Sequence, residues 1–306
     1  MRKRKYNQKS IRENIKYLFL SIVLITIAVI IFKVYKSKEN IIVADYYPET
    51  DTKVNISVGR IYETDGYIHT CIYPDNIDDT FVVDILLPDN YDEDKSYPVV
   101  YLTDCYWKRE DYPAIKALYE SGKTEEFILV GIGYPDDYDF GLIRNRDLIF
   151  HPHDFLRLIV EGILPYVESV YSIDADNRSF LGSSCGGYFM LYSLFQSDDL
   201  TKDVFKNYIV NSPVFYYYGN VKVPPYTLEE DYFLRNGNTL DAYVYMTVGG
   251  IESEENFKRP LKELADTMLS RNYNGLTLDY EVYEGLGHND VWVPTLLEGL
   301  SRCLAK

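Results

Sequence analysis

The residues best suited to chemistry form the run Gly182-Ser183-Ser184-Cys185-Gly186-Gly187, a G-x-S-x-G pattern. It follows a strand-like stretch at residues 177–181 and precedes an apolar, helix-like stretch at residues 188–195. A serine at such a sharp strand-to-helix turn lifts its hydroxyl above the sheet, and the flanking glycines avoid collisions across the turn. Backbone N–H groups at the helix N-terminus favour developing negative charge. We therefore predict that Ser184 is a nucleophile; a glycine-rich structural turn is the alternative.

A general base for this serine is expected later in the chain, because strand–serine–helix enzymes place serine, acid and histidine in that order. The chain has four histidines, and only His288 follows Ser184. It lies in the glycine-containing run 284–290, after a strand-like stretch at residues 278–283. A lone histidine is usually a surface or capping residue, but a loop at a strand end can hold an imidazole over the sheet edge. The sequence thus favours His288 as the base.

The acid of the triad is less well specified. Glu252 lies just beyond a strand-like stretch at residues 242–248, where a carboxylate could accept the histidine ring N–H and stabilise the imidazolium. Glu254 and Glu255 could instead belong to the first turn of the next helix, where acids suit the helix dipole. Glu284 also remains open. Glu252 is our choice.

The cysteines give no sign of a metal site. Cys71, Cys105, Cys185 and Cys303 show no C-x-x-C or other metal-ligand spacing. A cysteine nucleophile at Cys185 is an alternative, but Ser184 occupies the middle of the G-x-S-x-G pattern. We expect Cys185 to fill a small buried space. Asp147, His151 and His153 could line the site or cap helices, and we assign them no role.

The first 40 residues differ from the rest of the chain. Residues 1–16 are basic, and residues 17–34 form an almost continuous apolar run. About 17 to 20 apolar residues suffice to span a bilayer. We interpret these segments as a cytoplasmic tail and a single-pass membrane anchor, followed by a linker at residues 35–55 and a catalytic domain at residues 56–306. A cleaved signal peptide is the alternative, but no small-x-small cleavage site follows. The catalytic domain is expected outside the cytoplasm, at the cell membrane.

The charge of the chain argues against a nucleic-acid partner. The whole chain has 31 Lys/Arg and 47 Asp/Glu. Residues 1–40 hold 10 and 2 of these, a net charge of +8, which leaves 21 and 45, a net of −24, for residues 41–306. Nucleic-acid binding requires a basic surface. So acidic a domain is expected to gain solubility from its charge.

Strand-like and helix-like stretches alternate along the domain. The expected strands are residues 54–62, 69–73, 81–87, 98–103, 127–133, 177–181, 208–211, 242–248 and 278–283, and the expected helices are residues 114–121, 154–171, 188–195, 257–270 and 291–304. This alternation predicts an α/β domain with a mostly parallel sheet, helices on both faces and an antiparallel entry. Residues 214–240, rich in tyrosine, are expected to be an irregular insertion that forms a lid or ordinary loop packing.

Five stretches of the chain carry a family resemblance: Leu87-Pro88, Tyr91-Asp92 and Tyr97–Asp104; Gly131–Pro135 with Arg144 and Arg146-Asp147; the Gly182–Gly187 run; Asn211-Ser212-Pro213; and the Gly285–His288 loop. Through them the sequence resembles the enterochelin-esterase and esterase-D-like family of α/β-hydrolases over roughly residues 55–304. The resemblance implies an α/β-hydrolase fold and serine-dependent hydrolysis of carboxylic esters without a metal or organic cofactor. The substrate would be a small-molecule or cell-surface ester, with siderophore lactones, acylated sugars and feruloyl-type esters all open.

The resemblance also implies roles for individual residues. Ser184 matches the family nucleophile, His288 its base, and Glu252 stands where the family places its acid. The backbone N–H of Cys185 would be one oxyanion donor. The second would come from the loop after residues 102–104, where Cys105 stands in place of the usual glycine; Cys105 is our choice and Tyr106 the alternative.

Two other functions compete with hydrolysis. A mycolyltransferase-like enzyme would pass the acyl group to an alcohol or sugar in place of water. A membrane-anchored binding protein would use the scaffold without catalysis, which the presence of both Ser184 and His288 disfavours.

Overall fold

The structure is a computed structural model that describes residues 52–306 except 137, 218–220 and 223–224. The folded unit extends over Asp51–Lys306. It includes Val54, which is buried in the core and whose N–H donates to Glu161 at 2.9 Å. No helix in the described part of the chain is long and apolar enough to cross a membrane. The predicted tail and anchor, residues 1–34, lie outside that part.

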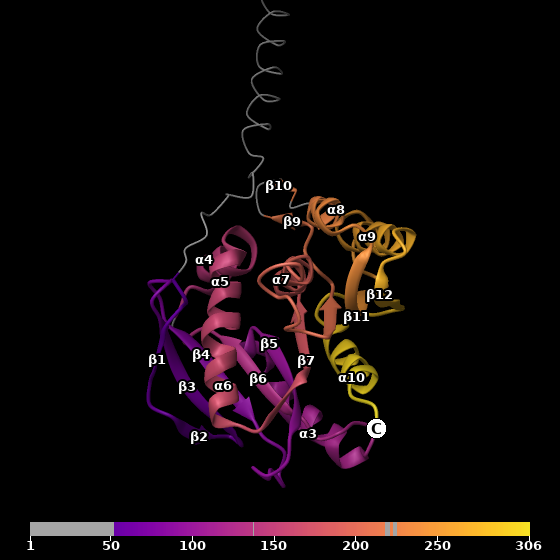
Figure 1. Cartoon of the computed structure of the whole chain (residues 1–306). Coiled ribbons are helices and arrows are strands. Elements are labelled where there is room, and N and C mark those ends of the chain that lie inside the picture. Colours follow the sequence, from indigo (N-terminus) through magenta and orange to yellow (C-terminus); the bar gives the residue numbers. More distant parts are fainter. Residues whose placement is uncertain (1–51, 137, 218–220, 223–224) are drawn as a thin grey trace, which may run out of the picture. The chain divides into compact units, whose positions relative to one another are not determined.

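A ten-stranded sheet forms the centre of the domain (Figure 1). Its order is β1-β3-β4-β6-β5-β7-β8-β11-β12, with β2 paired to β3. The strands are β1 Ile56–Val58, β2 Tyr62–Thr64, β3 Tyr67–Pro74, β4 Phe81–Leu86, β5 Tyr97–Thr103, β6 Ile128–Gly133, β7 Ile173–Ser183, β8 Asn207–Asn211, β11 Thr239–Gly249 and β12 Asn274–Tyr283.

The strand directions confirm the predicted fold class. Strands β6, β5, β7, β8, β11 and β12 are parallel, whereas β1 to β4 enter antiparallel. The carboxyl ends of parallel strands lie at one edge of a sheet, where α/β proteins bind ligands. The loops that follow β5, β7, β8, β11 and β12 therefore meet there, and they contain all the predicted site residues.

Helices cover both faces of the sheet. Along β5, Val99 and Tyr101 pack into one core, while Val100 and Leu102 pack into the other, as the two-residue period of a strand requires. One core is closed by α5 Pro152–Arg157, η3 Leu158–Ile163, α6 Leu164–Val170, α7 Cys185–Leu194, α8 Pro225–Asn236 and α9 Arg259–Ser270. The other is closed by α3 Tyr112–Ser121 and α10 Trp292–Cys303. Short segments α2 Cys105–Lys108, η1 Arg109–Asp111, α4 Phe140–Asn145, η2 Arg146–Phe150 and η4 Glu254–Lys258 complete the domain.

The structure corrects three expectations about the elements. The expected strand at residues 54–62 is two short strands, β1 and β2. The expected single helix at residues 154–171 contains a π-helical turn, η3, between α5 and α6. The insertion at residues 214–240 is not irregular, because it contains α8 and the two-residue strands β9 Tyr216–Tyr217 and β10 Val221–Lys222. Two of its aromatic side chains, Phe215 and Tyr232, are buried in the core and act as ordinary packing.

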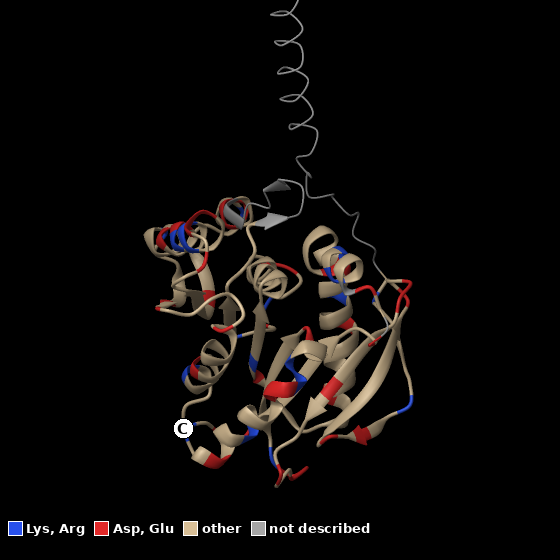
Figure 2. Cartoon of the chain, turned by 180° about the vertical axis from the view of Figure 1, so that it is seen from behind, with Lys and Arg blue, Asp and Glu red and all other residues tan. Residues whose placement is uncertain are grey.

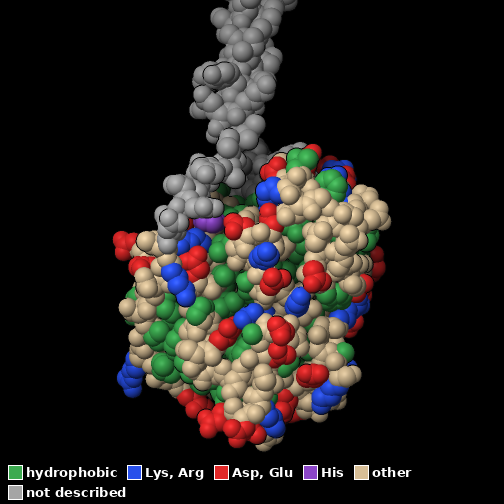
Figure 3. Space-filling model, in the orientation of Figure 1, with side chains coloured by type: hydrophobic (Ala, Val, Ile, Leu, Met, Phe, Trp, Pro, Cys, Tyr) green, Lys and Arg blue, Asp and Glu red, His purple; other side chains and the backbone are tan. Residues whose placement is uncertain are grey.

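Charged side chains are spread over the domain. Figure 2 shows Asp and Glu on many elements of the domain, with Lys and Arg scattered among them. On the face drawn in Figure 3, charged side chains also interrupt the apolar ones, as on an ordinary solvated surface.

Candidate active site

Ser184 lies at the turn between β7 and α7. Its φ and ψ angles are 61° and −116°, a conformation that costs a non-glycine residue energy and persists only where the surroundings hold it. Three backbone hydrogen bonds do so: Ser184 N–H donates to Asn211 O at 3.0 Å, and Ser184 O accepts from Tyr188 N at 3.0 Å and from Val214 N at 3.1 Å. The strand–serine–helix turn predicted from the sequence is therefore present.

The glycines around Ser184 are required by close backbone approach. A Cβ atom on Gly182 would lie 2.5 Å from Gly186 O, and one on Gly187 would lie 2.6 Å from Asn211 O. A Cβ atom on Gly186 would collide with Thr103 Oγ1 at the end of β5. The glycines of the G-x-S-x-G-G pattern are thus required because the turn packs tightly against β5 and β8.

Glu252 and His288 form a hydrogen-bonded pair. The His288 Nδ1 and Glu252 Oε2 atoms are 2.6 Å apart; the Glu252 side chain is 2% exposed and that of His288 33%. The His288 ring also contacts Phe257, with ring centroids 4.8 Å apart. Because Nδ1 faces the carboxylate, Nε2 remains for other partners. Of the four candidate acids, Glu252 is the one that the structure pairs with His288; Glu254, for example, pairs with Lys258 at 3.1 Å.

The other oxygen of Glu252 is also satisfied. Glu252 Oε1 accepts from Ser212 Oγ at 2.5 Å and from Gly249 N at 2.7 Å. Burial opposes ionisation of Glu252, but the hydrogen bonds from His288, Ser212 and Gly249 outweigh it and lower the pKa of the carboxyl group. Glu252 is therefore held as a carboxylate that can orient the imidazole. The sequence indicated no role for Ser212 itself, although it lies in the run Asn211-Ser212-Pro213 that contributes to the family resemblance.

Asn211 at the end of β8 joins the serine to this acid. Its backbone oxygen accepts from Ser184, and the next residue, Ser212, donates to Glu252. Its side chain accepts from Ser183 Oγ at 2.7 Å and donates to Thr247 and Thr295 at 3.0 Å each. The structure records no hydrogen bond between Ser184 Oγ and His288 in the described chain; such catalytic bonds commonly tighten only around a substrate.

The loop after β5 lies against the Ser184 turn. Asp104 adopts a left-handed conformation with φ 63°, and its carboxylate accepts two hydrogen bonds from Arg144, at 2.7 and 2.8 Å. Arg144 also donates to Ser183 O at 3.3 Å. The Asp104 and Arg144 side chains are only 3% and 14% exposed. This buried, two-bonded pair fixes the start of α2 beside the serine, a relation that the sequence motifs did not reveal.

The two cysteines predicted as oxyanion donors lie at the starts of helices. Cys185 is the first residue of α7 and Cys105 the first of α2. The Cys105 thiol packs on β6, where a Cβ atom on Gly133 would lie 2.8 Å from its Sγ. Burial raises the pKa of both thiols. A protonated, buried thiol is a poor nucleophile, which weighs against the alternative of cysteine chemistry at Cys185.

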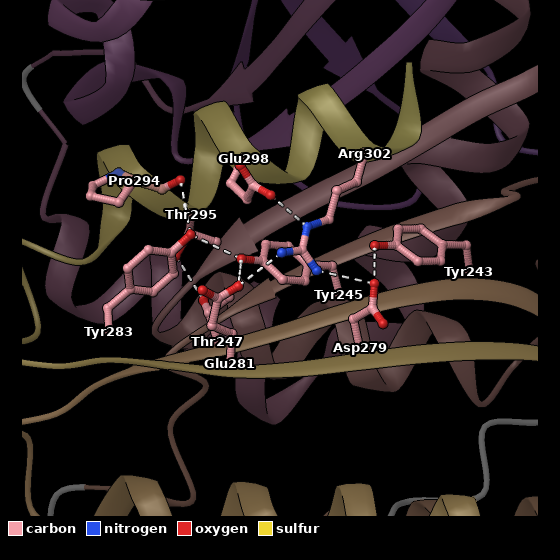
Figure 4. Close-up of polar contacts among 10 residues, drawn as sticks. All are labelled: Tyr243, Tyr245, Thr247, Asp279, Glu281, Tyr283, Pro294, Thr295, Glu298 and Arg302. Atoms are coloured by element: carbon pink, nitrogen blue, oxygen red, sulfur yellow. Dashed lines mark hydrogen bonds and ion pairs between the residues drawn. The ribbon is translucent and has the colours of Figure 1, made fainter. Parts of the chain in front are cut away.

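The two elements that flank the loop containing His288, β12 and α10, are joined by polar contacts (Figure 4). It follows Tyr283 of β12, whose hydroxyl lies 2.9 Å from that of Tyr245 and donates to Pro294 O of α10 at 3.4 Å. Further along α10, Arg302 binds Asp279 at 3.1 Å and Glu281 at 3.0 Å. These contacts join edge strand β12 to α10 and so restrict the loop between them.

The remaining candidates, Asp147, His151 and His153, lie in or between η2 and α5. Asp147 is buried and pairs with Arg146 at 2.6 Å. Burial lowers the pKa of His153. Within the described residues, no group of three or more His, Cys, Asp or Glu side chains is arranged to hold a metal ion.

Comparison with known proteins gives a family and a fold. Residues 75–303 match the model of the family described as "Putative esterase". The chain is 25% identical over 255 residues to the ferri-bacillibactin esterase BesA of Bacillus subtilis, covering 73% of this chain and 84% of that protein.

Solved structures share the architecture. The BES protein from Bacillus cereus superposes with a TM-score of 0.68 and 24% identity, covering 86% of this chain and 100% of that one. The siderophore hydrolase EstB from Aspergillus nidulans has a TM-score of 0.64 and 18% identity, covering 80% and 96%. These similarities and the parallel sheet confirm the α/β-hydrolase fold. Because the family model covers most of the chain, the protein belongs to the enterochelin-esterase-like "Putative esterase" family.

Proposed function

We propose that the protein is a serine esterase in which Ser184, His288 and Glu252 form a catalytic triad. The observation that carries this proposal is the continuous set of contacts from Ser184 through Asn211 and Ser212 to the Glu252–His288 pair. It would supply the three roles that acyl transfer needs: a strained, partly exposed serine, a base and a buried carboxylate that orients the base. Family membership supports ester hydrolysis as the reaction.

In the proposed mechanism, His288 Nε2 takes the Ser184 proton as Oγ attacks the ester carbonyl carbon. The carbonyl oxygen becomes an oxyanion held by the backbone N–H groups of Cys185 and Cys105. Glu252 stays ionised and stabilises the imidazolium, which then protonates the leaving alcohol. Water, activated by His288, attacks the acyl-enzyme, releases the acid and restores Ser184.

We propose a siderophore ester as the substrate. The support is the name of the curated relative, a ferri-bacillibactin esterase, together with that of the siderophore hydrolase that shares the fold.

We further propose that residues 17–34 anchor the domain at the outer side of the cell membrane. Carbonate-resistant membrane association that is lost on deletion of residues 1–40 tests this; association of the truncated chain would contradict it.

Active-site labelling tests the proposed function directly. The folded domain is expected to react with a fluorophosphonate probe, and peptide mapping should place the adduct on Ser184. Heat-unfolded protein is the control, because the activating geometry is then lost. Ferri-bacillibactin and a feruloyl ester, offered separately, then distinguish substrates: we expect faster cleavage of the siderophore. A folded domain that neither reacts with the probe nor hydrolyses either ester would overturn the proposal.

A further inference from the structure

The segment that follows β5, residues 105–111, is fastened to the sheet on one side. It consists of α2 and η1 and begins with Cys105, the second proposed oxyanion donor. Arg109 in this segment donates to Asp84 Oδ2 of β4 at 2.7 Å. Asp84 is fully buried and also binds His69 Nδ1 at 2.6 Å. This side of the segment therefore rests on a buried ion cluster in the sheet.

The other side of the segment is joined to α10. Lys108 Nζ lies 3.6 Å from the centre of the Trp292 ring, and Trp292 Nε1 donates to Asp111 Oδ2 at 2.7 Å. Trp292 is the first residue of α10, is only 4% exposed and lies four positions after His288. A single side chain thus receives two contacts from the α2–η1 segment, one on its ring face and one at its indole N–H.

Lys108 contacts an aromatic ring and not the carboxylate of an ion pair. Among the described residues it forms no ion pair within 4.0 Å, although it is only partly exposed. A cation over the face of tryptophan is stabilised by the ring quadrupole, the more so when it is desolvated. The contact with the Trp292 ring therefore links the Lys108 ammonium to the start of α10.

We propose that Lys108 and Trp292 are positioning residues that hold the α2–η1 segment against the start of α10. This inference rests on the proposed function. The contact keeps the Cys105 backbone N–H, an oxyanion donor, correctly positioned relative to the base, His288. Both groups must lie within a fraction of an ångström of their productive positions, because a misplacement of about 1 Å can cost about 100-fold in rate.

The contact depends on the protonation of Lys108. Burial lowers the pKa of Lys108 to about 8, while the nearby carboxylates of Asp104, Asp111 and Glu110 oppose that shift and Arg144 adds to it. Above about pH 8 the ammonium loses its proton and the cation–π attraction disappears. Activity should therefore fall on the alkaline side as Lys108 titrates.

The test compares Lys108→Met with Lys116→Met in the full-length protein. Methionine keeps an unbranched apolar stem and removes the charge. Lys116 on α3 is the matched control, since it makes only a partly exposed ion pair with Asp89. Hydrogen–deuterium exchange at pH 7 should become faster in Lys108→Met at both residues 105–111 and residues 285–291, and not in the control. Unchanged exchange in both segments would overturn the proposal.

Kinetics separate positioning from simple structural support. For Lys108→Met we expect kcat to fall by about 10- to 100-fold at pH 7 with KM within about twofold, and the alkaline decline of kcat near pH 8 to vanish. Faster exchange with an unchanged kcat and pH profile would contradict the positioning role. If the wild-type protein neither hydrolyses esters nor reacts with a fluorophosphonate, the proposed function fails, and the exchange experiment alone decides whether the contact holds the two segments.

Discussion

Replacing Ser184 with alanine is expected to lower kcat for ester hydrolysis by about 10⁴- to 10⁶-fold, the range found when a triad nucleophile is removed. Alanine lacks the hydroxyl that forms the acyl-enzyme, while the strained turn keeps its glycines and its hydrogen bonds to Asn211 and Val214. Residual activity should come from the oxyanion donors and substrate binding alone. The measurement is single-turnover and steady-state hydrolysis of a short-chain p-nitrophenyl ester and of ferri-bacillibactin.

Ser193→Ala is the matched control for this variant. Ser193 lies near the other end of the same helix, α7, nine positions after Ser184, and is fully buried. It should leave kcat within a fewfold of the wild type, as removal of a single buried hydroxyl chiefly affects stability, by about 1 kcal/mol. A Ser184→Ala protein that retains more than a tenth of wild-type kcat would show that Ser184 is not the nucleophile.

Replacing Glu252 with glutamine is expected to lower kcat by about 10³- to 10⁴-fold, as for amide substitution of the acid in other triads. Glutamine keeps the shape of the side chain but not its charge, so it neither stabilises the imidazolium nor fixes which ring nitrogen of His288 carries the proton. Glu254→Gln is the control, because Glu254 is exposed and paired with Lys258. Equal kcat values for the two variants would exclude Glu252 as the acid.

The Glu252→Gln substitution is also expected to change how the stability of the protein depends on pH. The folded-state pKa of Glu252 is lowered relative to its unfolded value, so the carboxylate contributes stability that is fully present above the unfolded pKa of about 4.3. That contribution is lost as the pH falls through the folded pKa. Below about pH 4, the free energy of unfolding measured in urea should therefore fall more steeply for the wild type than for Glu252→Gln. If the free energies of unfolding of the two proteins changed in parallel with pH, the native contacts would not lower the pKa of Glu252.

The sequence alone determined the features that rest on local patterns. The nucleophile turn at Ser184 is a short-range signal, since its glycines, preceding strand and following helix are contiguous. The alternation of strands and helices likewise predicted the parallel sheet, and the structure confirms it. The insertion at residues 214–240 was predicted wrongly because α8 has only a weak helical periodicity of apolar residues, although it packs through Tyr232 against the core.

Tertiary structure decided which distant side chains meet. Glu252, Glu254, Glu255 and Glu284 were not separable by sequence, because the distance of each from His288 depends on how β11 lies beside β12. Nor could any motif reveal that Asp104 binds Arg144 or that Lys108 rests on Trp292, contacts between residues 40 and 184 positions apart. Local patterns specify a strand, a turn or a helix. The parallel sheet brings the ends of its strands to one edge, and only there do the serine, the acid and the histidine loop come together.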